Sequence, residues 1–459
     1  MVDEVPRVLT IAGSDSGGGA GIQADLKTFA ALGVYGMTAL TAITAQNTVE
    51  VSAVQDVEPA VVRAQIRVVL DDIGVDAVKT GMLHTSKIIE VVSGELEQVK
   101  APIVVDPVMV AKSGAVLLKS RAVKTLRDRL IPLSVVVTPN ASEAEKIAGI
   151  KVRSIEDAKK AAEKISALGA KAVVVKGGHL STPGKAVDIL YFDGEFKLFE
   201  GERFETEMTH GTGCSFASAI AAELAKGRRI PEAVERAKGF VAYAIRFGFK
   251  IGRGRGPVNP MARLYNDSER YNVITELKKA VQMLESHPVV SRLIPEVQMN
   301  LVMALPYAMD YRDVAGIPGR IVRLNEKVKA SASPEFGASK HVANTVLTAM
   351  RHDPKIRSGL NIKYSEAVLK ACRTLFYKVS GYDRRKEPPE VKEKEGETTR
   401  WGTEEAIKKL GEVPDLIYHT GDWGKEPIST ILGKSATDTV IKAVRIALLL
   451  KGERPDRVL

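Results

Sequence analysis

The sequence predicts two α/β domains, a doubly wound parallel-sheet domain followed by a smaller one. Up to about residue 260, apolar runs of strand length alternate with amphipathic helical patterns. The Gly- and Arg-rich segment Ile251–Pro260 then ends this alternation, and a new helical pattern starts at Val273. The 459 residues also exceed one typical domain of ~150 residues about threefold. We therefore expect domains at 1–265 and 273–459.

Short apolar runs in the first domain are expected to be strands. They are Val8–Ile11, Ile103–Val105, Val135–Val137 and Val173–Val175. Uninterrupted apolar runs of this length are typical of strands that are buried on both faces of a parallel sheet. Helical patterns such as Ser154–Leu168 lie between them, which favours a sheet covered by helices on both faces.

Polar and glycine-rich residues follow each of these strands. The first strand runs into GSDSGGGAGIQAD (13–25), the second into Asp106, the third into Asn140 and the fourth into Lys176 and two glycines. Ligands of open parallel sheets bind at the carboxyl ends of the strands. The pattern therefore predicts a ligand crevice at this edge of the sheet.

The segment HGTGC, His210 to Cys214, opens a helical pattern. Glycines before a helix N-terminus let the backbone approach a ligand, and the helix dipole favours negative charge. We therefore expect an anion hole for a phosphoryl group at Gly211, Thr212 and Gly213. The helix start should also lower the thiol pKa of Cys214, so that a thiolate could accept the proton of a substrate hydroxyl. The alternative is a glycine-bearing turn around a small buried cysteine.

The second half predicts another set of strands and helices. Expected strands are Leu301–Leu305, Ile321–Leu324 and Leu416–Tyr418, and expected helices are Val273–Leu284, His341–Met350, Tyr364–Phe376 with Cys372 in the core, and Thr437–Leu450. The segment Arg384–Arg400 is rich in Lys, Arg, Glu and Pro, which favours an exposed loop. A lid over an anionic ligand is the alternative interpretation.

Polar residues gather in two loops and one turn of the second half. Arg320 follows a Pro-Gly turn, and Asp422 and Lys425 lie in HTGDWGKEP (419–427). A third group surrounds the start of an expected helix: Ser339, Lys340, His341 and Asn344. Free backbone N–H groups at a helix start favour anions, so these segments suit a diphosphate and a phosphate. The alternatives are surface, helix-capping or local turn roles.

Charge and composition exclude several classes of protein. The net charge is +10, of which +7 lies from Tyr271 onward, but no basic block is interleaved with aromatic residues, so we expect small anionic ligands and no nucleic acid. No apolar run reaches the ~18 residues of a membrane span. Two cysteines cannot build a disulfide framework, and His179 and His210 have no partners at metal-ligand spacing. A cytoplasmic protein is the expectation.

Seven motifs in order resemble hydroxymethylpyrimidine/phosphomethylpyrimidine kinase, a ribokinase-like kinase. They are GSDSGGGAGIQAD, TALTAITAQNT (38–48), KTGML (79–83), DPVMVAKSG (106–114), TPNASEAE (138–145), VKGGH (175–179) and HGTGC. The resemblance covers about the first 260 residues. It implies phosphorylation of 4-amino-5-hydroxymethyl-2-methylpyrimidine to its monophosphate and then its diphosphate, with ATP and Mg²⁺.

The same resemblance assigns site residues. It implies that Gln46 binds the pyrimidine, that Met82 and Val108 wall the ring and that Gly13 and Asp25 line the pocket. Asn140 and Glu143 would position magnesium and triphosphate, Lys176 would contact phosphate oxygens, and Cys214 would be catalytic. Taken singly, Gln46 could cap a turn, Met82 could be core and Glu143 could complement a helix dipole. The alternative family is a pyridoxal or pyridoxine kinase.

The second half resembles an archaeal-type thiamine-phosphate synthase domain. The similar segments are PGRIVRL (318–324), SPEFGASKHVANT (333–345), SGLNIKYSE (358–366), PPEVKEKEG (388–396) and HTGDWGKEP. The reaction implied is displacement of pyrophosphate from the pyrimidine diphosphate by thiazole phosphate. Arg320 and His341 are the expected catalytic residues, and the expected phosphate-binding residues are Ser339, Lys340, Asn344, Asn361, Asp422 and Lys425. A non-catalytic ligand sensor is the alternative, and both families favour a homodimer.

Overall fold

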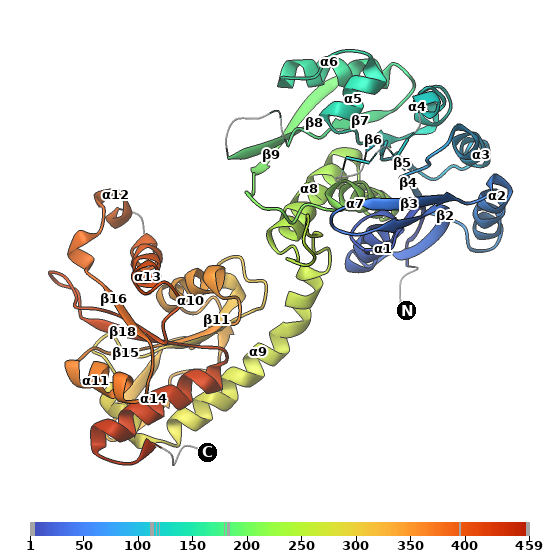
Figure 1. Cartoon of the computed structure of the whole chain (residues 1–459). Coiled ribbons are helices and arrows are strands. Elements are labelled where there is room, and N and C mark those ends of the chain that lie inside the picture. The colour runs from blue at the N-terminus through green and yellow to red at the C-terminus, as the bar shows by residue number, and fades with distance from the viewer. Residues whose placement is uncertain are drawn as a thin grey trace. The chain divides into compact units, whose positions relative to one another are not determined.

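A computed structural model gives the structure of the protein and describes residues 5–110, 114–115, 117–118, 120–178, 180, 184–393 and 396–455. It divides the chain into two units, Met1–Arg263 and Leu264–Leu459 (Figure 1). Helix α9 (Ala262–Glu285) is continuous through the polar residues 266–270, which lie between the two domains expected at 1–265 and 273–459. Polar residues are compatible with an exposed helical turn, and Arg270 pairs there with Asp267 at 3.7 Å, three residues away.

In the described part of the first unit, nine strands form one sheet, in the order β3-β2-β1-β4-β5-β6-β7-β8-β9. The strands are β1 (Arg7–Asp15), β2 (Tyr35–Gln46), β3 (Val51–Asp56), β4 (Ala77–Thr80), β5 (Ile103–Val105), β6 (Val136–Val137), β7 (Ala172–Val175), β8 (Lys185–Phe192) and β9 (Glu195–Glu202). Strands β2, β1, β4, β5, β6 and β7 are parallel, whereas β3, β8 and β9 join antiparallel at the edges. The predicted parallel sheet is confirmed.

Helices cover both faces of this sheet. They are α1 (Gly21–Ala31), α2 (Pro59–Val68), α3 (Ser86–Leu96), α4 (Ser120–Thr125), α5 (Ala141–Ala148), α6 (Ile155–Ser166), α7 (Thr212–Ala225) and α8 (Ile230–Arg246). Val8, Val104 and Val136 pack with α1, α7 and α8. Their neighbours along the strands, such as Leu9 and Val105, pack with α2 to α6. Successive strand residues therefore reach opposite cores, which explains the uninterrupted apolar runs.

The second unit contains a mixed sheet in the order β14-β11-β10-β15-β18-β17-β16. Its strands are β10 (Leu301–Ala304), β11 (Val314–Gly316), β14 (Glu335–Phe336), β15 (Ser358–Lys363), β16 (Val379–Tyr382), β17 (Leu416–His419) and β18 (Ile428–Gly433). Only β16 and β17 pair in parallel among these described strands. Strands β12 (Ile321–Leu324) and β13 (Lys327–Ala330) form a separate hairpin.

Helices complete the second unit and enclose one apolar core. They are α10 (Lys340–His352), α11 (Glu366–Thr374), α12 (Pro389–Lys392), α13 (Glu397–Leu410) and α14 (Ala436–Lys451). Cys372 is fully buried in this core, as predicted. The described part of 384–400, expected to be an exposed loop, instead holds α12 and the start of α13. Within this segment, the buried Glu387 carboxylate lies 3.9 Å from Arg384 Nε.

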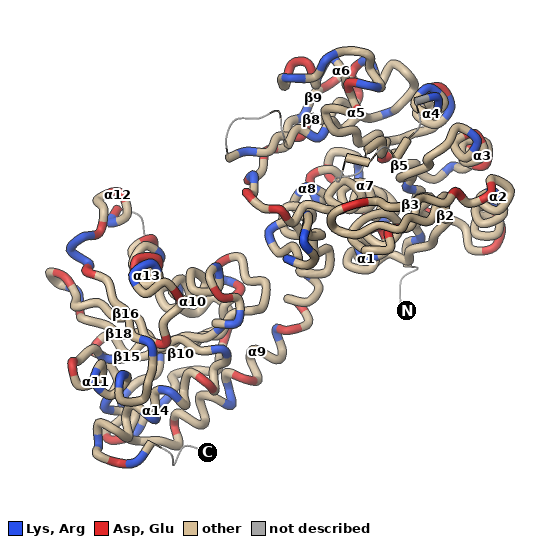
Figure 2. The backbone as a smooth tube through the Cα atoms, viewed as in Figure 1, with Lys and Arg blue, Asp and Glu red and all other residues tan. Residues whose placement is uncertain are grey.

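Charged side chains are distributed along both units. Figure 2 shows Lys and Arg interspersed with Asp and Glu over the backbone of each. The excess positive charge is therefore not confined to one run of the chain. Within the part of the chain that the structure describes, no helix combines the length and the apolar character that crossing a membrane requires.

Candidate active sites

The loop between β1 and α1 wraps around one carboxylate. Asp15 is almost fully buried, and it accepts the backbone N–H groups of Gly17, Gly19 and Ala20 at 2.8, 3.0 and 2.8 Å. Burial alone would raise the pKa of this carboxyl. The hydrogen bonds from His210, Ala20 and Gly17 outweigh that effect and hold the pKa below its ordinary value of 3.8. The glycines thus serve to turn several N–H groups toward a single anion.

Histidine 210 joins this loop to the HGTGC segment. Its Nε2 lies 2.9 Å from Asp15 Oδ2 and 3.4 Å from the Nε2 of Gln46, at the end of β2. The backbones also touch, because a β-carbon added at Gly211 (φ +80°) would lie 1.8 Å from the carbonyl oxygen of Gly19. Three motifs that are distant in sequence therefore meet around one imidazole. The sequence predicted a loop role for His210, and His179 lies outside the described residues.

The start of α7 lies beside a buried ion pair. Lys176 Nζ is 3.1 Å from Asp106 Oδ1, and a β-carbon at Gly213 would be 3.3 Å from the same ammonium. Burial lowers the pKa of Lys176, but Asp106 and Glu143 outweigh it and the pKa is raised. Helix α7 begins at Thr212, as predicted. A permanent cation thus faces the backbone of the expected anion hole.

Asn140 and Glu143 form a capping box at the start of α5. The Asn140 side chain accepts the N–H of Glu143 at 3.0 Å, and the Glu143 carboxylate accepts the N–H of Asn140 at 2.8 Å. Glu143 therefore has the helix-start role that the sequence left open as an alternative. Burial and the nearby Asp106 raise its pKa, while Lys176 lowers it. Two carboxylates and a lysine consequently share one partly shielded region.

Cys214 lies in the first turn of α7, but its thiol pKa is not lowered. Burial raises it to about 12; Lys79 and the Gly21 N–H act in the opposite direction, while Asp25 and Asp106 add to the rise. The prediction of a low pKa was therefore wrong. The helix start does favour a thiolate, but desolvation by the surrounding protein is the larger effect here.

Asp25 is a buried structural carboxylate and does not line a pocket. Its side chain is fully buried and accepts hydrogen bonds from the hydroxyls of Thr10 and Ser218 at 2.7 and 2.6 Å. The Lys79 ammonium donates to both of its oxygens, at 3.0 and 2.9 Å. Lys79, which sequence reasoning missed, is also fully buried, and Asp25 raises its pKa despite the cost of burial. A lysine inside the apolar strand β4 was the available signal, because a buried cation needs a partner.

The expected ring-binding residues form a small apolar cluster. Met82 packs with Ala42 and Leu117, and Val108 lies against them. A β-carbon at Gly13 would lie only 3.2 Å from the Met82 sulfur, so Gly13 borders the same cluster. These residues come from the ends of β1, β2, β4 and β5, where the sequence predicted a ligand crevice.

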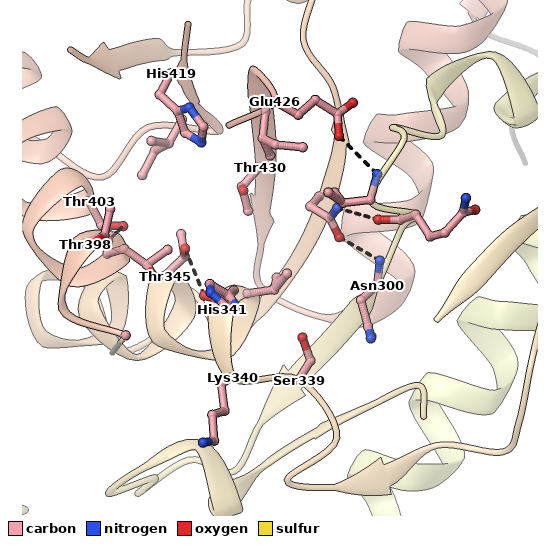
Figure 3. Close-up of a pocket in the computed structure, with 18 of the residues that line it drawn as sticks. Asn300, Ser339, Lys340, His341, Thr345, Thr398, Thr403, His419, Glu426 and Thr430 are labelled. Atoms are coloured by element: carbon pink, nitrogen blue, oxygen red, sulfur yellow. Dashed lines mark hydrogen bonds between the residues drawn. The ribbon is translucent and has the colours of Figure 1, made fainter. Parts of the chain in front are cut away.

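The second unit holds a cavity of about 600 Å³. Six of the predicted residues line it: Arg320, Ser339, Lys340, His341, Asn361 and Lys425. Figure 3 shows Ser339, Lys340 and His341 at the start of α10. Arg320 has a left-handed backbone (φ +72°), and its guanidinium donates to the carbonyl of Val297. The Lys340 ammonium lies 5.3 Å from the centre of the Tyr311 ring.

Three of the predicted phosphate-binding residues have other roles. Asn361 borders the cavity, but its amide is occupied by the backbones of Asn300 and Gln298 at 2.7 and 2.9 Å. Asn344 does not line the cavity, and it donates to the carbonyl of Gly396 at 3.2 Å. Asp422 also lies outside the lining and is 3.5 Å from Lys392. Short polar side chains in loops and helix starts serve the backbone as readily as a ligand.

Several cavity residues were missed by sequence reasoning. They include Asn300, Tyr382, Arg384, Thr403, His419 and Glu426. The carboxylate of Glu426 accepts the N–H groups of Glu296 and Val297 at 2.9 and 3.0 Å. It therefore holds the backbone of Val297, whose carbonyl accepts the hydrogen bond of Arg320. His419 ends the strand that enters HTGDWGKEP. That position at a strand end was a usable signal, but the sequence analysis assigned phosphate binding to the charged residues Asp422 and Lys425 beyond it.

Comparison with known proteins gives a family match for each unit. A family model described as phosphomethylpyrimidine kinase matches residues 15–259, and one described as thiamine-phosphate synthase ThiN matches residues 276–445. The Geobacter sulfurreducens "thiamine biosynthesis bifunctional protein ThiED" is 51% identical over 55% of this chain, which spans only 51% of that relative. The Streptomyces coelicolor hydroxymethylpyrimidine/phosphomethylpyrimidine kinase is 50% identical over 55% of this chain and 94% of its own.

Solved structures match the first unit. The ADP complex of Bacillus subtilis pyridoxal kinase is 43% identical with a TM-score of 0.54, covering 57% of this chain and 99% of its own. A Staphylococcus aureus pyridoxal kinase in complex with AMP-PCP and pyridoxal is also 43% identical, with a TM-score of 0.51, and covers 56% of this chain and 94% of its own. These complexes support the use of ATP by the first unit.

Fold, glycine loops and buried lysines define the first unit as a ribokinase-like small-molecule kinase. The chain belongs to the phosphomethylpyrimidine kinase family. Its second unit is a ThiN-type thiamine-phosphate synthase domain, so the chain is a bifunctional enzyme of thiamine biosynthesis. The alternative of a pyridoxal kinase joined to a ligand sensor is not favoured, because the family matches name the pyrimidine and the synthase.

Proposed function

We propose that the first unit phosphorylates 4-amino-5-hydroxymethyl-2-methylpyrimidine twice and that the second unit joins the resulting diphosphate to thiazole phosphate. The meeting of the two glycine loops at His210, beside Lys176 and the start of α7, carries the kinase assignment. Backbone N–H groups and a fixed cation at one point suit the charge of a transferring phosphoryl group. Gln46 and the Met82 cluster lie on the side where the pyrimidine would bind.

The residues of the first unit fit a magnesium ion. Glu143 and Asp106 are close enough to raise the pKa of Glu143, so a cation between them would relieve this repulsion. Magnesium needs only one or two protein carboxylates when phosphates and waters complete its shell. Among the described residues, no three His, Cys, Asp or Glu side chains lie together as a ready-made metal cluster. When bound, the ion would neutralise charge on the triphosphate.

Burial raises the pKa of the Cys214 thiol to about 12, so we infer that Cys214 is not a preformed base. We infer that the Cys214 thiol, in the first turn of α7, contacts the acceptor hydroxyl, while the fully buried Lys79 stays paired with Asp25. The hydroxyl oxygen attacks the γ-phosphorus, the bond to the ADP oxygen breaks, and the hydroxyl proton leaves for solvent or phosphate oxygen. Lys176 stabilises the charge that moves onto the leaving oxygen.

In the second unit, breaking the bond between the pyrimidine methylene and diphosphate leaves positive charge on the aminopyrimidine. The electron pair departs with the diphosphate, and the thiazole nitrogen forms the new C–N bond. Arg320 and the start of α10, with Ser339 and His341, line the cavity where the leaving diphosphate would be held. A homodimer remains the expectation for the whole chain, to be measured by light scattering.

One experiment tests the division of labour. The full chain is incubated with hydroxymethylpyrimidine, ATP, magnesium and thiazole phosphate, and each phosphorylated product is followed by mass, with pyridoxal as a parallel substrate. Cys214→Ala should stop phosphoryl transfer while supplied pyrimidine diphosphate is still converted, and Arg320→Gln should do the reverse. Preferred phosphorylation of pyridoxal, or loss of both activities in either variant, would contradict the proposal.

A further inference from the structure

The cavity of the second unit has two chemically different walls. One wall contains Arg320 and the start of α10 with His341, where N–H groups and cations favour anions. The other contains Tyr382 and His419, at the ends of β16 and β17. Figure 3 shows His419 and His341 on different sides of the cavity, reaching it from different elements. The walls are therefore suited to different parts of a substrate.

The hydrogen bonding of His419 fixes its proton. The N–H of Gly421 donates to Nδ1 at 3.2 Å, so the neutral ring carries its own proton on Nε2. The imidazole is largely buried, and burial together with Arg384 lowers its pKa to about 4. Because Nδ1 is occupied, the ring cannot act as a base there. At neutral pH it offers one uncharged N–H donor.

Tyr382 provides a rigid aromatic surface beside that donor. The centre of its ring is 5.3 Å from that of His419 and 5.8 Å from that of Trp401. Tyr382 and His419 are paired in the register of the parallel strands β16 and β17. Helix α13 approaches closely through Gly402, where a β-carbon would lie 2.2 Å from the Tyr382 ring. Packing of this density leaves the ring one position. A flat heterocycle could lie against it.

We propose that the aminopyrimidine ring of the diphosphate substrate binds on the Tyr382–His419 wall, with the His419 Nε2–H donating to a ring nitrogen and the diphosphate directed to Arg320 and α10. This inference rests on the proposed synthase function. His419 then contacts the substrate directly and recognises the heterocycle through this hydrogen bond. Its ring nitrogen partner accepts the hydrogen bond, and no proton is transferred.

The charge that develops in the reaction favours this arrangement. When the diphosphate leaves, the pyrimidine becomes cationic, and an aromatic face stabilises a nearby cation. A protonated histidine would oppose that charge, whereas the neutral His419 does not. Arg384, the cation beside this wall, has the buried carboxylate of Glu387 at 3.9 Å, which offsets its field. Besides Arg384, the cations that line the cavity include Arg320 and Lys340 on the opposite wall and Lys425 in the loop after β17.

Two substitutions separate the donor from the fold. His419→Gln keeps an N–H near the Nε2 position, whereas His419→Asn keeps an acceptor for Gly421 and removes that donor. Steady-state kinetics of the full chain with supplied pyrimidine diphosphate and thiazole phosphate, without ATP, give both KM values. We expect His419→Asn to raise the KM for the diphosphate roughly tenfold, with Gln restoring most of it and the KM for thiazole phosphate unchanged.

The controls distinguish every result. His352→Asn changes an exposed histidine that pairs with Glu404 at 2.7 Å outside the cavity lining, and it should leave both KM values unchanged. A raised KM for thiazole phosphate alone, an unchanged His419→Asn, or equal losses in both variants with a lower unfolding temperature would overturn the inference. A wild-type chain without synthase activity would overturn the proposed synthase function itself. An active wild type with an unaffected His419→Asn variant would overturn only the placement of the pyrimidine ring.

Discussion

The two sites of this chain are built in different ways. The candidate kinase site is built largely from backbone: the loop after β1 turns the N–H groups of Gly17 and Gly19 toward Asp15, and the glycine segment before α7 touches that loop. The synthase site is a cavity lined by side chains from the mixed sheet, the β12–β13 hairpin, α10 and α13. A backbone site depends on local sequence, whereas a side-chain cavity depends on how distant segments pack. The difference sets how each should respond to substitution.

The largest effect is expected where the two glycine loops touch. Gly211→Ala forces a β-carbon to within 1.8 Å of the Gly19 carbonyl, at a φ of +80° that also disfavours alanine. The loops must separate, so the backbone that we propose to bind phosphate is displaced. We expect phosphorylation of hydroxymethylpyrimidine to fall by roughly 1000-fold or more, as in the loss of combined oxyanion contacts. Product formation by mass provides the measurement.

A matched glycine controls for the substitution itself. Gly239 lies within α8, and a β-carbon there would meet nothing within 4 Å. Gly239→Ala should keep full kinase activity, and both variants should retain synthase activity on supplied diphosphate. A Gly211→Ala chain that phosphorylates normally would show that the contact between loops is not needed, and the contrast between the two sites would disappear.

The kinase site was predictable because its residues stand in short motifs. Four strand ends and one glycine segment before a helix already placed Asp106, Asn140, Lys176 and Gly213 on one edge of the sheet. Parallel strands bring their carboxyl ends together whatever the loop details, so motif order was enough. The motifs did not predict how deeply each of these side chains is buried. Asp25 was expected to line the pocket, but it is fully buried and paired with Lys79.

The synthase site was only partly predictable. Arg320 and His341 line the cavity as expected, whereas Tyr382 and His419 come together through the parallel pairing of β16 and β17. Nothing in the local sequence specifies that pairing. The continuous α9 was missed for a related reason, because a polar stretch is equally compatible with a linker and an exposed helix turn.

Alkylation tests whether burial or the helix start controls Cys214. Raising the pKa from about 9 to about 12 removes thiolate near pH 8, although the remaining thiolate is more nucleophilic. We expect alkylation by iodoacetamide to be roughly 40-fold slower than for an ordinary cysteine, after allowing for both effects. The rate rises with pH beyond 9. Peptide mass spectrometry separates Cys214 from Cys372, and a Cys214 that reacts rapidly at pH 7 would restore the lowered pKa.

A moderate effect is expected at Asp15. Because its folded pKa lies below 3.8, the carboxylate stabilises the loop above that pH, and this contribution is lost as the pH falls through the folded value. Asp15→Asn keeps the shape but weakens the hydrogen bonds to Gly17, Gly19 and Ala20. These amides should exchange about tenfold faster at pH 7, as for a loss of ~1.4 kcal/mol.

The pH dependence identifies the cause of that change. Hydrogen exchange of the 13–25 segment should differ between wild type and Asp15→Asn at pH 7, and the difference should shrink as the pH falls below 3.8 and through the folded pKa of the carboxyl. The second unit serves as the internal reference, because its amides should exchange equally in both proteins. A difference that stays constant from pH 7 to pH 3 would assign the effect to shape and not to charge.

The smallest effect is expected at Asp422, and it tests the border of the synthase cavity. Its carboxylate accepts the N–H of Trp423 at 2.8 Å and lies 3.5 Å from Lys392, while its neighbour Lys425 lines the cavity. Exposed ion pairs of this kind contribute only about 0 to 1 kcal/mol. Asp422→Asn should therefore leave kcat/KM of the synthase within about fivefold, the factor to which ~1 kcal/mol corresponds. A loss of two orders of magnitude would mean that HTGDWGKEP moves onto the substrate, and that this cavity, like the kinase site, depends on a loop.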